Sequence, residues 1–178
     1  IRSASFTVFT VACFPQSDND VDFIINSFEN LFFFDSPKHI SQVKSAFTDF
    51  IERINKRSKT LKEEQVIRIE TEILKIASNH MIPSYISSHR QFAFDIAKPI
   101  IEASPSLLLK IDIDNYVCLR SIFSLFLDSN SSLSSSSIAL MRKVCNENEE
   151  VMNKVVQFDH AKDFLFPEIK SLNEPSES

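Results

Sequence analysis

The histidines and cysteines are the side chains of this sequence best suited to bind a metal ion or to act as nucleophiles. They are His39, His80, His89 and His160, together with Cys13, Cys118 and Cys145. A metal site on one helix needs ligands about one turn apart, such as two histidines at positions i and i+4. No histidine pair has that spacing, and no histidine lies within helical reach of a cysteine. The sequence therefore predicts no metal site and no cofactor.

The three cysteines are scattered and form no C-x-x-C motif. Cys118 and Cys145 have apolar neighbours, and a buried free cysteine acts as a small hydrophobic residue. Cys118 lies in the first turn of a predicted helix, which can lower the pKa of a thiol, but no base accompanies it. An odd, dispersed set of cysteines is typical of reduced thiols inside the cell. We expect a non-catalytic protein, not an enzyme, in the cytoplasm or nucleus.

Two aspartates, Asp112 and Asp114, flank Ile113 just before a predicted helix. Paired acids at this spacing occur in calcium loops, but such loops also need glycine at the sixth position and glutamate at the twelfth. Neither requirement is met. We expect Asp114 to be the N-cap of the following helix.

A basic cluster is the candidate partner-binding site. It consists of Arg53, Lys56, Arg57, Lys59 and Lys62. These cations could bind phosphate or an acidic peptide, or serve as a localisation signal. The simpler interpretation is a solvated helix end, where cations match the negative pole of the helix dipole. Because the net charge is −5 and the pI is about 5.4, nucleic acid is an unlikely partner.

Residues 129–137 form a serine-rich segment. We expect it to be a flexible loop with the next helix beginning near Ser136. Its serines could accept phosphate, which would be favoured beside a helix N-terminus. Asn130-Ser131-Ser132 also fits a glycosylation sequon, although the cysteines argue against secretion.

The absence of glycine limits the fold more than any other property of the composition. Average usage would give about a dozen glycines in a chain of this length. Tight hairpins and phosphate-binding loops depend on the positive φ angles that glycine adopts, so sheet-rich and nucleotide-binding folds are disfavoured. No apolar run reaches the roughly 18 residues of a membrane span. The composition favours an all-α fold, with 17 phenylalanines supplying core volume.

Apolar periodicity and capping residues predict nine or ten short helices. The spacing predicts helices over residues 4–14, 18–34, 36–59 and 60–79, the last opened by a Thr60–Glu63 capping box. Further helices are predicted from Ser88 through Ile101 with a kink at Pro99, from Ser104 through Leu109, and over residues 117–127, 136–146, 147–158 and 160–172. The helix over 18–34 is apolar around much of its girth, so we expect it to be buried on more than one side.

The region Ser136–Leu172 resembles armadillo or HEAT repeats. The resemblance rests on Ile138-Ala-Leu-Met-Arg-Lys-Val-Cys-Asn-Glu-Asn148, followed by Val151 and Val155. In such repeats, an apolar helix ends in an Asn-containing turn that leads into the next helix. The resemblance implies an α-solenoid that binds protein partners along one surface, and it assigns no functional residue. An irregular multi-helix bundle is the alternative architecture.

We expect residues 1–172 to form one domain and residues 173–178 to be a disordered tail. The chain does not begin with methionine, which suggests a segment of a longer protein. The apolar N-terminal helices, with Phe6, Val8, Phe9, Val11 and Phe14, would then be an open face available for self-association. The predicted function is a protein-interaction scaffold. The alternatives are a nucleic-acid- or transcription-related helical domain using Arg53–Lys62, and a regulatory or oligomerisation segment of a larger protein.

Overall fold

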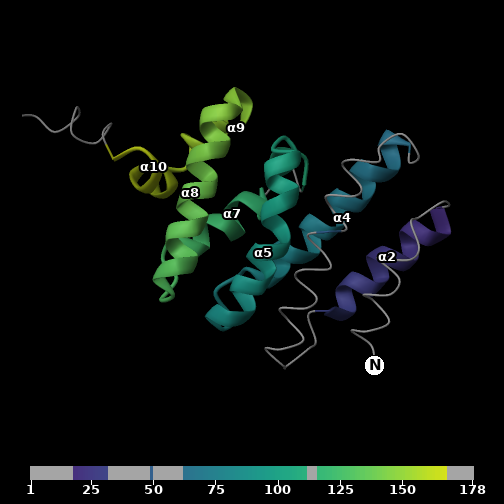
Figure 1. Ribbon diagram of the computed structural model, residues 1–178. Coiled ribbons are helices and arrows are strands. Elements are labelled where there is room, and N and C mark those ends of the chain that lie inside the picture. Colours follow the sequence, from purple (N-terminus) through teal and green to yellow (C-terminus); the bar gives the residue numbers. More distant parts are fainter. Residues whose placement is uncertain (1–17, 32–48, 50–61, 112–115, 168–178) are drawn as a thin grey trace, which may run out of the picture.

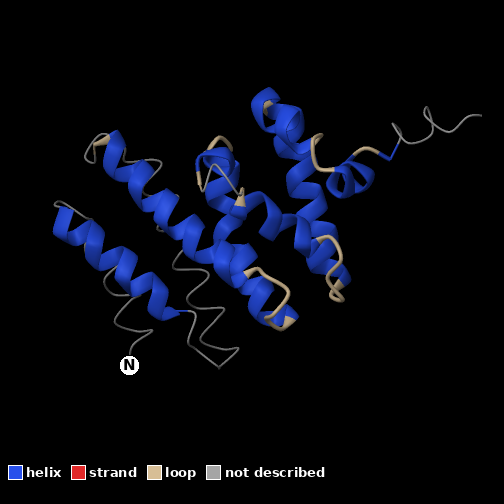
Figure 2. Cartoon of the chain, turned by 180° about the vertical axis from the view of Figure 1, so that it is seen from behind, coloured by secondary structure: helices blue, strands red, loops and turns tan. Residues whose placement is uncertain are grey.

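The computed structural model describes residues 18–31, 49, 62–111 and 116–167 (Figure 1). These residues form eight α-helices, and no strand occurs among them (Figure 2). The helices are α2 (Asp18–Leu31), α4 (Glu63–His80), α5 (Ser87–Ala103), α6 (Leu107–Lys110), α7 (Val117–Leu125), α8 (Ser131–Glu147), α9 (Glu149–Val155) and α10 (Asp159–Leu165). The predicted all-helical fold is confirmed.

The helices follow one another across the molecule in nearly the order of the chain (Figure 1). Helix α4 packs between α2 and α5, while α8 packs against α5 and α7 and carries α9 and α10. A single hydrophobic core runs through all of these layers, from Val21 in α2 to Leu165 in α10. Each helix thus buries its apolar face mainly against the helices next to it.

The central pair, α4 and α5, follows the predicted apolar spacing closely. In α4, the side chains of Ile69, Ile73 and Ala77 are fully buried, and in α5 those of Ile96 and Ile100 are fully buried. Burying an isoleucine side chain stabilises a fold by about 1.5–3 kcal/mol, so these two stripes hold the helices together. Helix α5 continues through Pro99 to Ala103.

Helix α2 is more one-sided than its composition predicts. Val21, Ile24 and Phe28 are fully buried, but Phe23 is 54% exposed. The prediction of burial on several sides is therefore wrong at Phe23. Arg68 of α4 pairs with Asp22 at 2.5 Å.

Two helix starts differ from the predicted caps. The residue before α4 is Lys62, whose backbone N–H donates to Oε1 of Gln65 at 3.3 Å, so Gln65 takes the place predicted for Glu63. The residue before α7 is Tyr116, not Asp114, and it adopts the left-handed conformation with φ 49°. That conformation costs a non-glycine residue about 1–3 kcal/mol. Packing offsets the cost, because Nζ of Lys154 lies 4.0 Å from the Tyr116 ring centroid and Phe158 meets the ring edge-on.

The serine-rich segment is helical, so the prediction of a loop through Ser137 is wrong. Helix α8 begins at Ser131, where Asn130 Oδ1 accepts from the N–H groups of Ser132 and Leu133 at 3.1 and 3.4 Å. The hydroxyl of Ser137 is buried and donates to the carbonyl of Ser134 at 2.8 Å. A good cap and the buried Leu133–Ser137–Met141 face outweigh the weak helix preference of serine.

The remaining predictions fall partly outside the described residues. The helices over 4–14 and 36–59, the capping residue Thr60, the acids Asp112 and Asp114, and the tail 173–178 all lie there. Helix α10 ends at Leu165, seven residues before the predicted Leu172. Arg142 of α8 closes it, donating to the carbonyls of Phe164 and Leu165 at 2.9 and 3.2 Å. None of the described helices has the length and apolar character to cross a membrane.

Candidate interaction surface

The structure describes little of the predicted basic cluster. Arg53, Lys56, Arg57 and Lys59 lie outside the described residues, and Lys62 is an exposed side chain just before α4. The partner-binding role predicted for this cluster stays a prediction.

The two described cysteines are packing residues. Cys118 is fully buried, and burial raises the pKa of its thiol to about 12, although a hydrogen bond with Ser78 acts in the opposite direction. Burial likewise raises the pKa of Cys145 to about 11. Both thiols are therefore protonated at neutral pH, whereas a nucleophile or metal ligand must be a thiolate.

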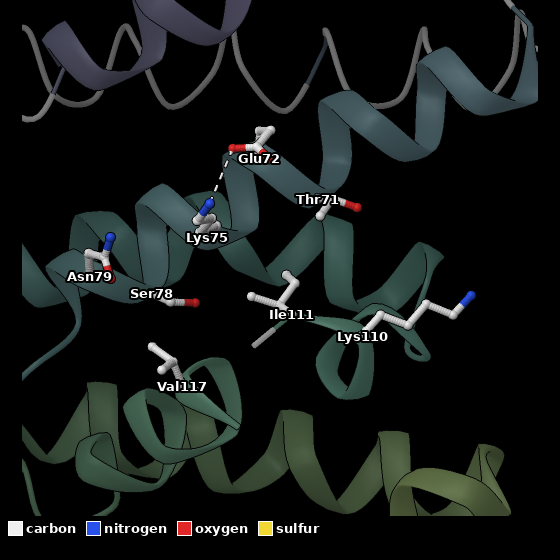
Figure 3. A pocket seen from close by; sticks show the side chains of 8 residues that line it. All are labelled: Thr71, Glu72, Lys75, Ser78, Asn79, Lys110, Ile111 and Val117. Atoms are coloured by element: carbon white, nitrogen blue, oxygen red, sulfur yellow. Dashed lines mark ion pairs between the residues drawn. The ribbon is translucent and has the colours of Figure 1, made fainter. Parts of the chain in front are cut away.

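A pocket of about 430 Å³ lies between α4 and the segment around α6 and α7 (Figure 3). Three of its polar side chains have partners: Ser78 Oγ donates to the carbonyl of Leu74 at 2.7 Å, and Lys75 lies 3.8 Å from Glu72. Figure 3 shows Lys110 extending away from the other side chains. Among the described lining residues, no base lies against a nucleophile.

The two most exposed large apolar side chains among the described residues, Ile86 and Leu127, lie on two turns. The two-turn surface consists of Ile82, Tyr85 and Ile86 from the turn between α4 and α5, and Leu127 from the turn between α7 and α8. Ile86 and Leu127 are 74% and 78% exposed, and Ile82 and Tyr85 are each 38% exposed. Within the described part of the chain, the other exposed large apolar residues are Phe23 and Ile67, 54% and 42% exposed, and they lie on α2 and α4. Exposed apolar clusters of this kind mark sites of interaction.

A buried arginine fastens the two turns together. Arg90 of α5 is 6% exposed, and its Nε donates to the carbonyl of Met81 at 2.8 Å in the first turn. A second nitrogen donates to both the carbonyl and the hydroxyl of Ser124 at 2.9 Å, while the third donates to Asp128 in the second turn. Ser87 and Ser129 also share a hydrogen bond at 3.2 Å. These hydrogen bonds join the two turns, and both turns lie toward the lower edge of the described chain in Figure 2.

The carboxylate of Asp128 is buried and ionised. Burial alone would raise its pKa, but hydrogen bonds from Ser87 and the Asn130 N–H, together with the charge of Arg90, lower it below its ordinary value. The Asp128 side chain is only 1% exposed, so its charge faces inward toward Arg90. Residues 81–89 contain no aspartate, glutamate, lysine or arginine, and Asp128 is the only one of these within residues 126–130. The two turns therefore present an apolar surface rimmed by serine hydroxyls.

A histidine pair lies beside this surface. Nδ1 of His80, at the end of α4, is 2.9 Å from Nε2 of His89 in α5, and Tyr85 stacks on His89 with ring centroids 4.5 Å apart. Burial lowers the pKa of both histidines, and the charge of His89 lowers that of His80 further. The spacing of the histidines within single helices did not predict this pair, because the two rings belong to different helices. Pro83, which ends helices, was the available sign that the chain reverses between the two histidines.

No known protein family, curated protein or solved structure matches this chain. Among the described residues, no group of three or more histidine, cysteine, aspartate or glutamate side chains could hold a metal ion. The two-turn surface combines exposed apolar side chains with a buried ion pair, and it is the candidate site of this chain.

Proposed function

We propose that this chain is a non-catalytic protein-interaction module that binds an apolar, uncharged segment of a partner protein through the two-turn surface. The observation that carries the proposal is the combination of exposed Ile86 and Leu127 with the buried Arg90–Asp128 pair beneath them. Burying a charged pair is costly unless each group is fully hydrogen-bonded. Here the pair is well bonded, and it fixes the position of two apolar loop tips that contribute little to the core.

The charge of the surface supports the class of partner. Asp128 faces inward, and the exposed rim consists of Ser84, Ser88 and Ser129. An acidic peptide, a nucleic acid or an anionic lipid would be expected to meet lysine or arginine side chains, and neither turn contains one that is exposed. Branched apolar residues and a tyrosine instead suit the buried centre of a protein interface.

A peptide-display selection on the immobilised chain tests this function. We expect it to enrich peptides with clustered apolar side chains, and Ile86→Asp combined with Leu127→Asp to weaken their binding by about tenfold or more, roughly the effect of losing one interface hot spot. Ile67→Asp is the matched control, since Ile67 is an exposed isoleucine, 42% accessible, on α4. It should leave peptide binding unchanged.

Unchanged affinity of the double variant would contradict the proposal, as would a selection that enriches nothing beyond what the double variant enriches. Two further results would assign a different partner to the two-turn surface. Sedimentation showing a dimer that the double variant abolishes would make a second copy the partner. Binding to neutral lipid vesicles that depends on Ile86 and Leu127 would make the surface a lipid contact.

We also propose that the helices form an armadillo- or HEAT-like array. The support is the arrangement in which α4, α5 and α8 each pack between neighbours and follow the order of the chain (Figure 1). The two alternative functions, a nucleic-acid-related domain using Arg53–Lys62 and a regulatory or oligomerisation segment, remain predictions. A salt titration of DNA binding tests the first, and sedimentation of the isolated chain tests the second.

A further inference from the structure

We propose that His80 and His89 form an open two-histidine site for a divalent transition-metal ion of the Cu²⁺ or Ni²⁺ type. The site shares Tyr85 with the two-turn surface, but its proposal does not depend on the proposed partner binding. It rests on two imidazole rings that belong to different helices and are brought nitrogen to nitrogen by the turn between α4 and α5. Imidazole nitrogen is a preferred ligand of these ions.

The distance between the nitrogens fits such an ion. Nδ1 of His80 and Nε2 of His89 are 2.9 Å apart. Two nitrogen ligands that bind one ion at 2.0–2.1 Å are separated by about 2.9 Å when the angle at the ion is 90°, and by about 3.3 Å when it is tetrahedral. The observed separation is that of a hydrogen bond between the rings, and it places both nitrogens within reach of one ion once the rings turn.

Binding requires a small rearrangement with a simple proton balance. In the ion-free pair, one ring nitrogen carries the proton of the hydrogen bond and the other accepts it. For both nitrogens to bind the ion, the rings turn and the bridging proton moves to the other nitrogen of its own ring. A neutral pair therefore releases no net proton. Both rings are only half-buried, so an ion can enter and solvent can fill its remaining coordination positions.

Tyrosine fluorescence provides a direct test. The chain has no tryptophan and two tyrosines: Tyr85, which stacks on His89, and Tyr116, which lies against Lys154 and Phe158. We expect Cu²⁺ added to the full chain to quench the tyrosine emission saturably at one equivalent. His80→Gln or His89→Gln should raise the Cu²⁺ concentration at half-maximal quenching, the quenching midpoint, by about tenfold or more. Each variant removes half of the protein ligands. Tyr85→Phe should remove the quenched component, whereas Tyr116→Phe should retain it.

The matched control is His160→Gln, because His160 is an exposed histidine at the start of α10. An unchanged midpoint in both His80→Gln and His89→Gln would overturn the proposal, as would a midpoint shifted by His160→Gln. If a variant fails to fold, NMR spectra of the unmodified chain provide the test instead. Substoichiometric Ni²⁺ should broaden the ring resonances of His80 and His89 before that of His160, and uniform broadening of all histidines would overturn the site.

Discussion

At the scale of single residues, Glu70 is an acidic side chain in an unfavourable, buried environment. It lies on the buried face of α4, 1% exposed, where the Ser104 hydroxyl donates to its Oε2 at 2.8 Å. Its Oε1 has no hydrogen-bond partner. Burial raises the pKa of this carboxyl above its ordinary value near 4.5, although the Ser104 bond acts in the opposite direction. Ionising Glu70 therefore destabilises the folded chain.

The pH dependence follows from which state holds the proton. Because the folded carboxyl keeps its proton to a higher pH than the unfolded one, the contribution of Glu70 to stability falls as the pH rises above about 4.5. Glu70→Gln removes the charge and keeps an acceptor for Ser104. We expect this variant to be more stable than the original chain at pH 7.5, by on the order of 1 kcal/mol, and to lose that advantage near pH 4.5.

Urea denaturation at the two pH values measures this difference. Glu64→Gln, an exposed position in the first turn of the same helix, is the control: it loses a favourable interaction with the helix dipole and should not be more stable than the original chain at pH 7.5. A Glu70→Gln variant that is less stable at pH 7.5 would show that the carboxylate is stabilised by an interaction that the burial argument omits.

At the scale of elements, the start of α8 depends on one side chain. Asn130 accepts two backbone N–H groups of the first turn. Asn130→Ala should therefore lower the free energy of unfolding by about 1 kcal/mol, the usual cost of a lost N-cap. Asn153→Ala, on the exposed side of α9, should have a much smaller effect. Chemical denaturation compares the two, and equal losses would mean that the α8 cap is dispensable.

The same elements show which features the sequence could predict. Apolar spacing placed α4 and α5 well because Ile69, Ile73, Ile96 and Ile100 are both periodic and buried. It failed in the serine-rich start of α8, where the helix depends on a cap and on tertiary burial of Ser137, neither of which follows from composition. The left-handed Tyr116 was equally unpredictable, since its strain is offset by Lys154 and Phe158 from the region of α9.

The candidate sites were less predictable than the helices, because each is made by contacts between elements. Arg90 reaches Asp128 across 38 positions of sequence, and no local pattern links them. The exposure of Ile86 and Leu127 also depends on how the turns lie against the core. The nearest sequence signal was Pro83, which could have indicated the reversal that brings His80 to His89.

At the scale of the whole molecule, α4 and α8 each contact both α5 and α7, so these four helices form the centre of the described chain. Helix α2 packs on α4, and α10 packs on α8, with α5 and α7 between them (Figure 1). In the proposed repeat-type array, stability would be approximately a sum of local packing and neighbour interfaces. Damage at one end should then have its main effect on nearby helices.

Native-state hydrogen exchange tests this arrangement. Phe28 is fully buried at the α2–α4 contact, and Phe28→Ala should cost about 3–5 kcal/mol. We expect faster exchange in α2 and α4, while amides of α8 and α10 keep their original rates, because local opening need not disrupt distant layers. Met141→Ala, at a fully buried position of α8, should give the mirror pattern. If either variant accelerates exchange equally in all described helices, the fold is one cooperative bundle, and the proposed repeat-type array is wrong.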